Sequence, residues 1–337
     1  MALWFWRLRR YYCCMLKLRL TFSIVAAAVL FAGCGGTGMS PNAPTAIGVS
    51  SAAQEARSTP VPDLFRKGIY VATGSAIYGY PANNRHNHQP KCMVGVEYAG
   101  AVAVDGVGNL IVPDGGSRSV TIFKGPEMCG PELGSFNDSY GQPTDAASNN
   151  AATGIIAVAN IFDGSGAGSI SICTLQGGCT KNLTNSNMYE VVGVAMAKDG
   201  DCWASATNSA GTATLTFFKS CSGSGQTATG FKNTYYGGLD IDSHGNLVAI
   251  DAFTPELWVY KGCNPKCSVV GGPLALHGDT TSGHLNKNST LFAAGDFSNG
   301  DVDIYAYSPT SLKYKYSCCE VTASEVFGVA YNPRSKE

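Results

Sequence analysis

Six short segments, each preceding an apolar run, gather the aromatic and acidic side chains of this chain that could bind a ligand. Aromatic rings stack on sugars or contact cations, and carboxylates orient hydroxyl groups or neutralise a cation or metal ion. The alternative is that the rings wedge between neighbouring structural units while the acids face water. The residues of this candidate ligand-binding set are Glu97, Tyr98, Asp138, Tyr140, Tyr189, Glu190, Tyr235, Tyr236, His277, Asp279, Glu325 and Phe327.

A second set of polar residues follows apolar runs instead of preceding them. Short Asp, Asn and Thr side chains at such places accept backbone N–H bonds and hold the turn that follows. We therefore expect a structural role, capping turns, for Thr73, Asp114, Asn160, Thr207, Asp251 and Asp296.

Familiar catalytic signatures are missing from the sequence. It contains neither a Gly-x-Ser-x-Gly nucleophile elbow nor a phosphate-binding loop. We assign no catalytic residue and no metal ligand, although a divalent cation at the centre of the fold is compatible with the acidic side chains of the first set.

The elements that must position these residues are repeats. Gly193, Gly238, Gly283 and Gly328 are spaced 45 residues apart, and each opens a similar stretch of sequence. A period of about 40–45 residues with alternating apolar runs and polar turns is typical of the four-stranded blades of a propeller. The clearest copies are residues 100–114 and 238–251.

The two ends of the repeat region complement each other. Residues 69–80 look like the second and third strands of a blade, and residues 326–331 look like a first strand with nothing after it. Joined, they make one blade and remove an open sheet edge. The sequence thus predicts an all-β domain over residues 63–337, a six-bladed β-propeller of four-stranded antiparallel blades whose C-terminal strand pairs with the N-terminal blade.

The pattern Ala-Val-Asp-Gly-x-Gly-Asn-Leu-x-Val-x-Asp at residues 103–114 resembles the NHL-repeat propellers and the wider group of SMP-30/gluconolactonase-like proteins. That resemblance implies the propeller fold and two functions: a non-catalytic binding scaffold, or a metal-dependent lactonase or hydrolase whose central cation polarises a carbonyl and activates water. Arg66-Lys-Gly-Ile69 stands where the enzymes have Glu-Gly-Pro, and Gly237-Gly238 where they have Asn-Gly. We therefore rank the binding scaffold first and the hydrolase as the alternative.

The N-terminal residues 1–33 read as an export signal. Five basic residues and no acid precede an apolar stretch at residues 20–32, which is too short to span a bilayer. Leu30-Phe-Ala-Gly-Cys34 looks like a bacterial lipobox, so we expect lipidation of Cys34; the alternative is an ordinary signal peptide cut nearby. Residues 34–62 are rich in Gly, Ser, Thr and Pro and read as a flexible tether to the membrane. The expected location is the periplasmic or cell-surface side of a bacterial membrane.

Charge and cysteine content agree with export. Residues 1–33 contain five of the 23 basic residues and none of the 24 acidic ones, so the exported chain is acidic and unsuited to nucleic acid. Ten cysteines remain after Cys13, Cys14 and Cys34, an even number that suggests disulfides. Zinc is a rival only for the Cys263-x-x-x-Cys267 spacing, and no second such pair with nearby His accompanies it. The pairs expected are Cys173 with Cys179, Cys202 with Cys221 and Cys263 with Cys267.

Overall fold

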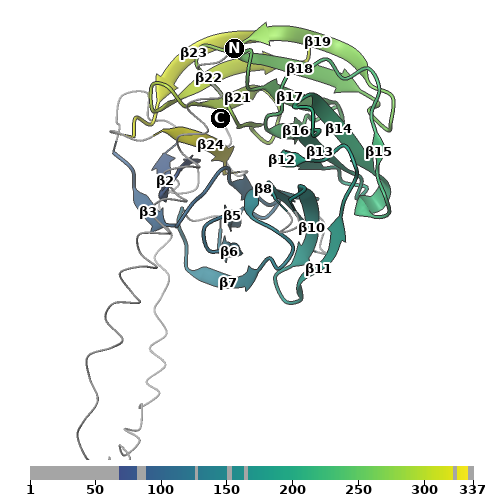
Figure 1. Cartoon of the computed structure of the whole chain (residues 1–337). Coiled ribbons are helices and arrows are strands. Elements are labelled where there is room, and N and C mark those ends of the chain that lie inside the picture. The colour runs from purple at the N-terminus through teal and green to yellow at the C-terminus, as the bar shows by residue number, and fades with distance from the viewer. Residues whose placement is uncertain are drawn as a thin grey trace, which may run out of the picture. The chain divides into compact units, whose positions relative to one another are not determined.

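The computed structural model describes residues 68–81, 89–125, 128–149, 154–162, 166–321 and 325–332. These residues form six four-stranded antiparallel sheets arranged in a ring, a six-bladed β-propeller, as the sequence predicts (Figure 1). The predicted signal peptide, Cys34 and the predicted tether lie outside the described residues. Within the described residues, no helix has the length and apolar character needed to cross a membrane.

The blades follow one another along the chain, and each starts at its innermost strand. Blade one contains β24 (Val326–Tyr331), β1 (Gly68–Thr73), β2 (Ala76–Pro81) and β3 (Cys92–Gly95). Blade two contains β4 (Ala103–Val104), β5 (Leu110–Asp114), β6 (Ser119–Phe123) and β7 (Glu132–Asn137). Blade three contains β8 (Pro143–Ser148), β9 (Ile156–Asn160), β10 (Ser169–Thr174) and β11 (Gly178–Leu183).

Blades four to six complete the ring, and Figure 1 shows β19 and β23 at the periphery with β12, β16 and β24 nearer the centre. Blade four contains β12 (Glu190–Met196), β13 (Cys202–Thr207), β14 (Ala213–Phe218), the short 3₁₀ helix η2 (Lys219–Cys221) and β15 (Gln226–Thr227). Blade five contains β16 (Leu239–Ile241), β17 (Leu247–Asp251), β18 (Glu256–Lys261) and β19 (Ser268–Ala275). Blade six contains β20 (Gly283–Leu285), β21 (Leu291–Asp296), β22 (Asp301–Ser308) and β23 (Ser311–Cys318).

Blade one is assembled from both ends of the propeller. The C-terminal strand β24 pairs antiparallel with β1, in a register that sets Val329 opposite Val71 and Ala330 opposite Tyr70. Because β24 is the innermost strand, its pairing completes both the blade and the ring. The predicted closure by the C-terminal strand is therefore confirmed.

The core lies between the blades. Second strands are buried on both faces because a neighbouring blade covers each side, and this explains their continuous apolar runs, such as Leu247–Asp251. The outermost strands alternate instead, and β7 is largely exposed. Apolar clusters accordingly join residues of adjacent blades: Val248 and Ile250 of β17 pack with Phe292 and Ala294 of β21.

The repeated glycines mark close approaches of neighbouring inner strands. A Cβ atom at Gly193 would lie 2.3 Å from the carbonyl oxygen of Gly237, so only glycine fits. Gly283 is not equivalent to Gly193 and Gly238, despite the 45-residue spacing. It pairs with Ala294, the position that Leu239 occupies in blade five, and Ser282 stands where Gly238 does.

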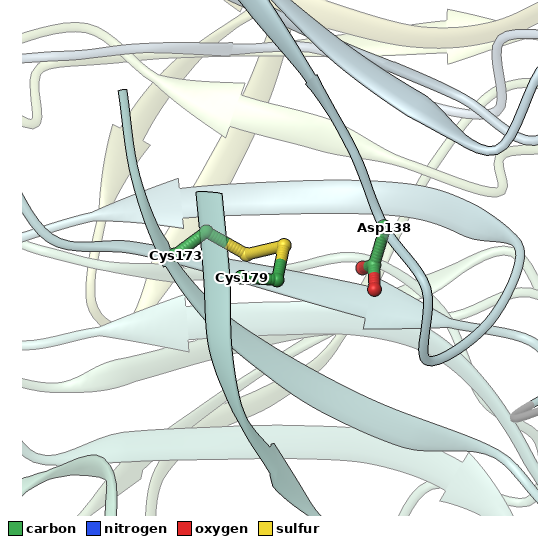
Figure 2. Close-up of side chains that lie close together, drawn as sticks. All are labelled: Asp138, Cys173 and Cys179. Atoms are coloured by element: carbon green, nitrogen blue, oxygen red, sulfur yellow. A yellow bond between two sulfur atoms is a disulfide. The ribbon is translucent and has the colours of Figure 1, made fainter. Parts of the chain in front are cut away.

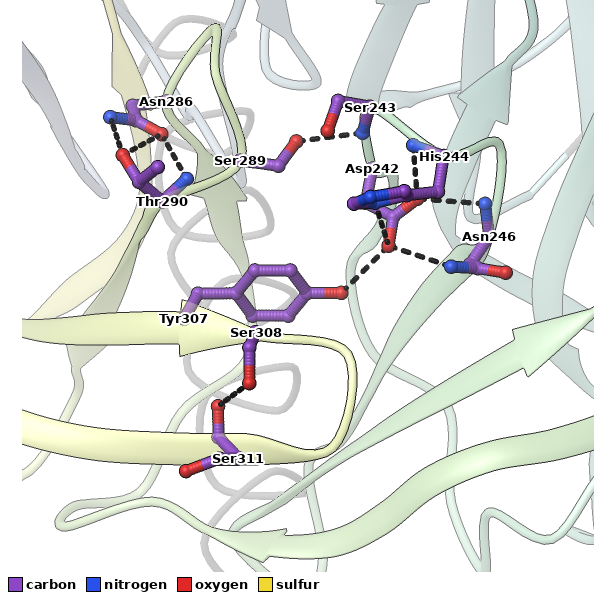
Figure 3. A network of polar contacts seen from close by, with 10 residues as sticks. All are labelled: Asp242, Ser243, His244, Asn246, Asn286, Ser289, Thr290, Tyr307, Ser308 and Ser311. Atoms are coloured by element: carbon purple, nitrogen blue, oxygen red, sulfur yellow. Dashed lines mark hydrogen bonds and ion pairs between the residues drawn. The ribbon is translucent and has the colours of Figure 1, made fainter.

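Two of the turns between first and second strands, at one end of the channel, are held by their own aspartates, Asp105 and Asp242. Asp242 accepts the backbone N–H groups of His244 and Asn246 with one oxygen, and the Asn246 amide and the Tyr307 hydroxyl with the other (Figure 3). Asp105 binds the N–H groups of its own turn in the same way. These carboxylates are fully used by the fold, and this end of the channel therefore offers no obvious binding group in them.

Disulfides connect cysteines within and between blades. The three expected pairs are present: Cys173 with Cys179, Cys202 with Cys221 and Cys263 with Cys267. A fourth, between Cys92 of β3 and Cys129 in the β6–β7 connection, links blades one and two and was not predicted. Cys318 and Cys319 are buried and are not bonded to any of these eight cysteines.

Candidate functional site

The candidate site is the mouth of the central channel, and a capping aspartate shapes its loops. Asp114, the last residue of β5, accepts the N–H groups of Gly116 and Ser117 in the turn that follows. It also accepts the N–H groups of Glu97 and Tyr98, which belong to the loop entering the same blade. One buried carboxylate therefore fixes two loops of the mouth, a larger role than the expected turn cap.

Asp251 plays the same double part in blade five. Its Oδ1 accepts the N–H of Phe253 in the following turn, and its Oδ2 binds both the backbone N–H and the hydroxyl of Thr234 in the entering loop. Asp296 accepts N–H groups of its own turn, and the Thr73 hydroxyl oxygen accepts the N–H of Ala76. The residues that end the second strands are thus the supports of the mouth.

Two of the expected caps behave differently. The Asn160 amide donates to the Asp138 carboxylate and to the Ser171 hydroxyl, so the acceptor of this blade is Asp138, supplied by the entering loop. Thr207 lies one residue beyond the corresponding position. Ala206 packs into the core between blades three and four, the face that the capping residues of the other blades also occupy. Successive side chains of a strand point to opposite faces, so Thr207 faces the other way.

One aromatic group at the mouth surrounds a carboxylate. The rings of Tyr235 and Tyr236 lie 4.2 Å apart with their hydroxyls at 3.3 Å, and Phe253 lies 6.3 Å from Tyr235. Tyr236 hydrogen-bonds Glu190, whose pKa is nevertheless raised because burial disfavours its charge. Tyr189 and Phe253 are 44% and 51% exposed, so the group presents open aromatic surface. This arrangement suits a ligand with a sugar-like or cationic group.

A second aromatic group lies where blades one, two and six meet. Phe327 makes edge contacts with Tyr98 at 5.8 Å and with Phe297 at 5.2 Å. Burial raises the pKa of Tyr98, and the nearby charge of Glu325 adds to the shift. Through its contact with Phe327, Tyr98 is packed between blades one and two. This fits the alternative in which the aromatic rings wedge between neighbouring blades. Beside this group, Glu97 is exposed and Glu325 is partly exposed.

Other members of the predicted set do not join these groups. His277 stacks on Tyr314 of the outermost strand β23, with ring centroids 3.9 Å apart, so it lies away from the channel. Asp138 is 1% exposed and its carboxylate binds Ser171, Asn160 and the N–H of Tyr140, which makes it a structural residue. The Asp279 carbonyl accepts the N–H of Phe297.

Asp138 also belongs to a cluster that superficially resembles a metal site. Donor atoms of Asp138, Cys173 and Cys179 lie within 4.8 Å of one another, the one such grouping found in the described part of the chain. Figure 2 shows why it does not fit a metal: the two sulfurs are bonded to each other. A metal binds the thiolate, and a disulfide offers none. The residues therefore do not supply a ligand set.

A less expected feature lies on the inner strands. Each second strand carries, at or next to its end, one of the residues just described, with Ala206 taking that place in blade four. The residue three positions earlier pairs with a residue of the inner strand, and this inner-strand position can be compared from blade to blade. Four blades carry alanine there: Ala103, Ala147, Ala195 and Ala330. Blades five and six instead carry Asp240 and His284, paired with Val248 and Ala293. Adjacent blades thus replace a methyl group by an acid and an imidazole.

Asp240 and His284 contact each other. The Asp240 Oδ2 lies 3.3 Å from the His284 Nδ1 and also accepts the backbone N–H of Leu285. Because a carboxylate only accepts, Nδ1 carries the proton of this bond. The buried Nε2 atom of His284 has no hydrogen-bond partner among the described residues. A buried polar atom of this kind is usually satisfied by water or by a ligand.

Asp145 adds a third charge from blade three. It is fully buried, and its two oxygens accept the N–H groups of Ala146 and of Val194 on the next inner strand. Burial raises its pKa to about 6, against the attraction of His284. Burial alone would lower the pKa of His284, but Asp240 and Asp145 outweigh it and the pKa is raised. The inner strands therefore hold a coupled group of one imidazole and two carboxylates.

Comparison with known proteins shows the fold but no family. No family model matches the chain, and no curated protein sequence matches it. Among solved structures, a chain of a nidogen/laminin complex superposes with a TM-score of 0.55 at 10% identity, covering 79% of this chain and 98% of that one. A protein of unknown function from Bacteroides caccae gives a TM-score of 0.56 at 10% identity, covering 79% of this chain and 98% of that chain.

A third structure bears on the alternative function. A putative 6-phosphogluconolactonase from Bacteroides fragilis superposes with a TM-score of 0.51 at 10% identity, covering 81% of this chain and 99% of that one. At such low identity, the three likenesses show the class of fold, a β-propeller, and nothing of the activity.

Proposed function

We propose that this propeller is a non-catalytic binding module, a ligand- or protein-binding scaffold that uses the mouth of its central channel. The ligand, a small molecule such as a carbohydrate or a segment of a protein, would present a cationic or hydroxyl-rich group. The aromatic group around Glu190 would supply stacking surface and a carboxylate. Behind the mouth, the inner strands would supply Asp240 and His284.

The observation that carries the proposal is the Asp240–His284 pair. Four blades show that alanine satisfies the fold at this position. Two interacting ionisable groups in the remaining blades cost desolvation free energy without being needed by the architecture. Such a departure from the repeat, combined with an unpartnered Nε2, is typical of a position kept for binding.

The repeat also supplies the test. The double variant Asp240→Ala/His284→Ala places in blades five and six the residue that the other four blades use, so we expect it to fold. Binding is measured by calorimetry and by the shift in melting temperature with neutral sugars, amino sugars and choline. A ligand at about 100 times its Kd stabilises the folded state by about 2.7 kcal/mol. The expected result is a shift in the wild type that the double variant loses.

His244→Ala is the matched control, because it removes an imidazole from an exposed turn at the other end of the channel. Glu190→Gln, paired with Glu132→Gln on the outermost strand β7, tests the mouth in the same way. Binding that survives the double variant and Glu190→Gln alike would refute the assignment to the channel and its mouth. Failure of every probe would refute a site for small polar ligands and leave a protein partner.

We further propose that the propeller is tethered outside the cytoplasm as a lipoprotein. The support is the sequence of residues 1–62, with its basic start, short apolar stretch and Cys34. Expression in a bacterial host with a radiolabelled fatty acid should label the wild type and not Cys34→Ser. An unlabelled wild type, processed before another residue, would point to an ordinary signal peptide. Membership of the NHL-like or SMP-30-like propellers is proposed on the repeat pattern alone.

A metal-dependent lactonase or hydrolase is the alternative. Its support is the sequence resemblance and the likeness in fold to the putative 6-phosphogluconolactonase. The cluster around Asp138 does not fit a metal, so we derive no catalytic step. Melting in EDTA and then with Ca²⁺, Mg²⁺, Mn²⁺ or Zn²⁺ separates the two functions. A rise specific to one ion, lost in Asp240→Ala/His284→Ala, would favour the hydrolase and justify a screen of lactones.

A further inference from the structure

Cys318 and Cys319 are adjacent in the sequence and their sulfur atoms lie 2.6 Å apart. Two non-bonded heavy atoms are at their best separation at about 3.5–4.0 Å. A disulfide bond measures about 2.05 Å. The two sulfurs are therefore much closer than separate thiols would rest, and bond formation would need only a small further approach.

No other cysteine is available to either of them in the described part of the chain. The remaining eight cysteines there form four disulfides. Cys318 and Cys319 are 4% and 1% exposed, and both belong to the apolar cluster that includes Val302 and Val326. A soluble thiol reagent or a second protein would therefore reach neither sulfur in the folded state.

The pair lies at the turn that leads from the last blade toward the strand that closes the ring. Cys318 is the last residue of β23, opposite Val302, and Cys319 has a φ of 62°, in the left-handed region. The chain turns here out of the last blade, and the N–H of Val321 binds the carbonyl of Gly300. A few residues later it enters β24, the strand that closes the ring. A disulfide at this turn would constrain the backbone direction of the segment that leads into β24.

We propose that Cys318 and Cys319 form a disulfide between adjacent residues in the exported protein, an oxidative modification site at the turn that leads into the closing strand. The oxidant is a disulfide, either of a thiol–disulfide exchange protein or of a small molecule. One cysteine thiolate attacks it and releases one of its sulfurs as a thiolate. The other cysteine thiolate then attacks the mixed disulfide, forming the Cys318–Cys319 bond and releasing the oxidant's second sulfur. Two protons leave the cysteines, and two electrons pass to the oxidant.

The burial of the pair implies that the bond forms before the ring closes. Burial raises the pKa of the Cys319 thiol, and the neighbouring Cys318 and Asp301 add to the effect. The attacking species in exchange is the thiolate, so a folded, reduced pair exchanges slowly. The bond, once made, is equally protected from reductants while the protein stays folded.

The test uses the full-length protein purified without reductant. It is denatured with iodoacetamide present and digested with trypsin, which cuts after Lys315 and Arg334. The resulting peptide, residues 316–334, contains Cys318 and Cys319 and no other cysteine. We expect mass spectrometry to find it unalkylated and lacking two hydrogen atoms. The peptides holding Cys202 and Cys221, which should appear linked to each other, are the internal control.

Reduction is the second measurement. Dithiothreitol before alkylation should label both cysteines when urea is present, and neither when the protein is kept native. Alkylation of both cysteines in the unreduced protein, with the Cys202–Cys221 link intact, would overturn the proposal. A crosslink from residues 316–334 to any other peptide would overturn it as well. Because these readouts use the wild type, they do not depend on whether a cysteine variant folds.

Discussion

Asp145→Asn should change how the stability of the propeller depends on pH. In the wild type, the pKa of the buried Asp145 is raised from 3.8 to about 6, chiefly by desolvation. The groups that face it are Asp240 and His284, and the backbone N–H groups of Ala146 and Val194 bind its oxygens. An acid with a folded-state pKa above its unfolded value binds its proton more tightly when folded. Its ionisation therefore destabilises the fold as the pH rises.

The magnitude follows from the shift. A shift of about two pKa units corresponds to about 3 kcal/mol of unfolding free energy, accumulated between pH values near 3.8 and 6. About 2 kcal/mol of it should appear between about pH 4 and pH 6. In this window His284 is mostly protonated in the unfolded chain, where its ordinary pKa is 6.5, and more fully protonated when folded, because its pKa is raised there. Other carboxyls with raised pKa, Glu190 and Asp301, cancel between the wild type and the variant.

The assay is urea unfolding followed by tryptophan fluorescence at half-unit steps of pH. From pH 4 to pH 6, the unfolding free energy of the wild type should fall by about 2 kcal/mol more than that of Asp145→Asn. This difference in slope is the readout, and a constant difference in stability between the two proteins does not affect it. Asp199→Asn, in the exposed β12–β13 turn, serves as the reference for losing one aspartate. Parallel curves for the wild type and Asp145→Asn would refute the reasoning, because the carboxyl would then titrate alike in both states.

Three further changes test the architecture. Gly193→Ala should cost about 1–3 kcal/mol, since its Cβ would meet a carbonyl oxygen at 2.3 Å, whereas Gly95→Ala, with nothing within 4 Å, should be near neutral in urea unfolding. Asp251→Ala should cost about 2–4 kcal/mol by leaving the N–H groups of two loops unpaired, measured in the same way. Deleting residues 326–337 removes the inner strand of blade one, so cooperative unfolding should be lost; a single transition of unchanged midpoint would show that β24 is dispensable.

The fold could be predicted because a propeller repeats its local rules. Turn signals, apolar second strands and two incomplete ends specify blades and ring closure without knowledge of long-range contacts. Exact register was harder, because a residue inserted in one element shifts every later position by one. Gly283 fits the period of 45 residues, but pairing shows that Ser282 holds the equivalent place. Thr207 ends its second strand, but Ala206, 45 residues before Asp251, holds the equivalent place. A period counts residues, whereas a side chain's face depends on the bulges between them.

The site was predicted less well, because the loops that hold its residues do not repeat. Sequence reasoning put Glu190, Tyr235 and Tyr236 in one candidate set, and in the structure Tyr236 hydrogen-bonds Glu190 and stacks beside Tyr235. It placed His277 there too, although the side chain lies against Tyr314 on the outermost strand. It also could not pair Cys92 with Cys129, since that link joins two blades whose relative placement only the closed ring determines.

The Asp240–His284 pair went unnoticed for a different reason, and that reason bears on how such propellers should be read. Its signal is present in the sequence, but only as a contrast: at one aligned position, four inner strands have alanine and two have ionisable residues. Residues that recur in several blades are explained by the architecture, as the strand-ending Asp114, Asp251 and Asp296 are. A residue that departs from the others at a buried position costs free energy that the fold does not require. Function in a repeat protein is therefore best sought where the repeat is broken.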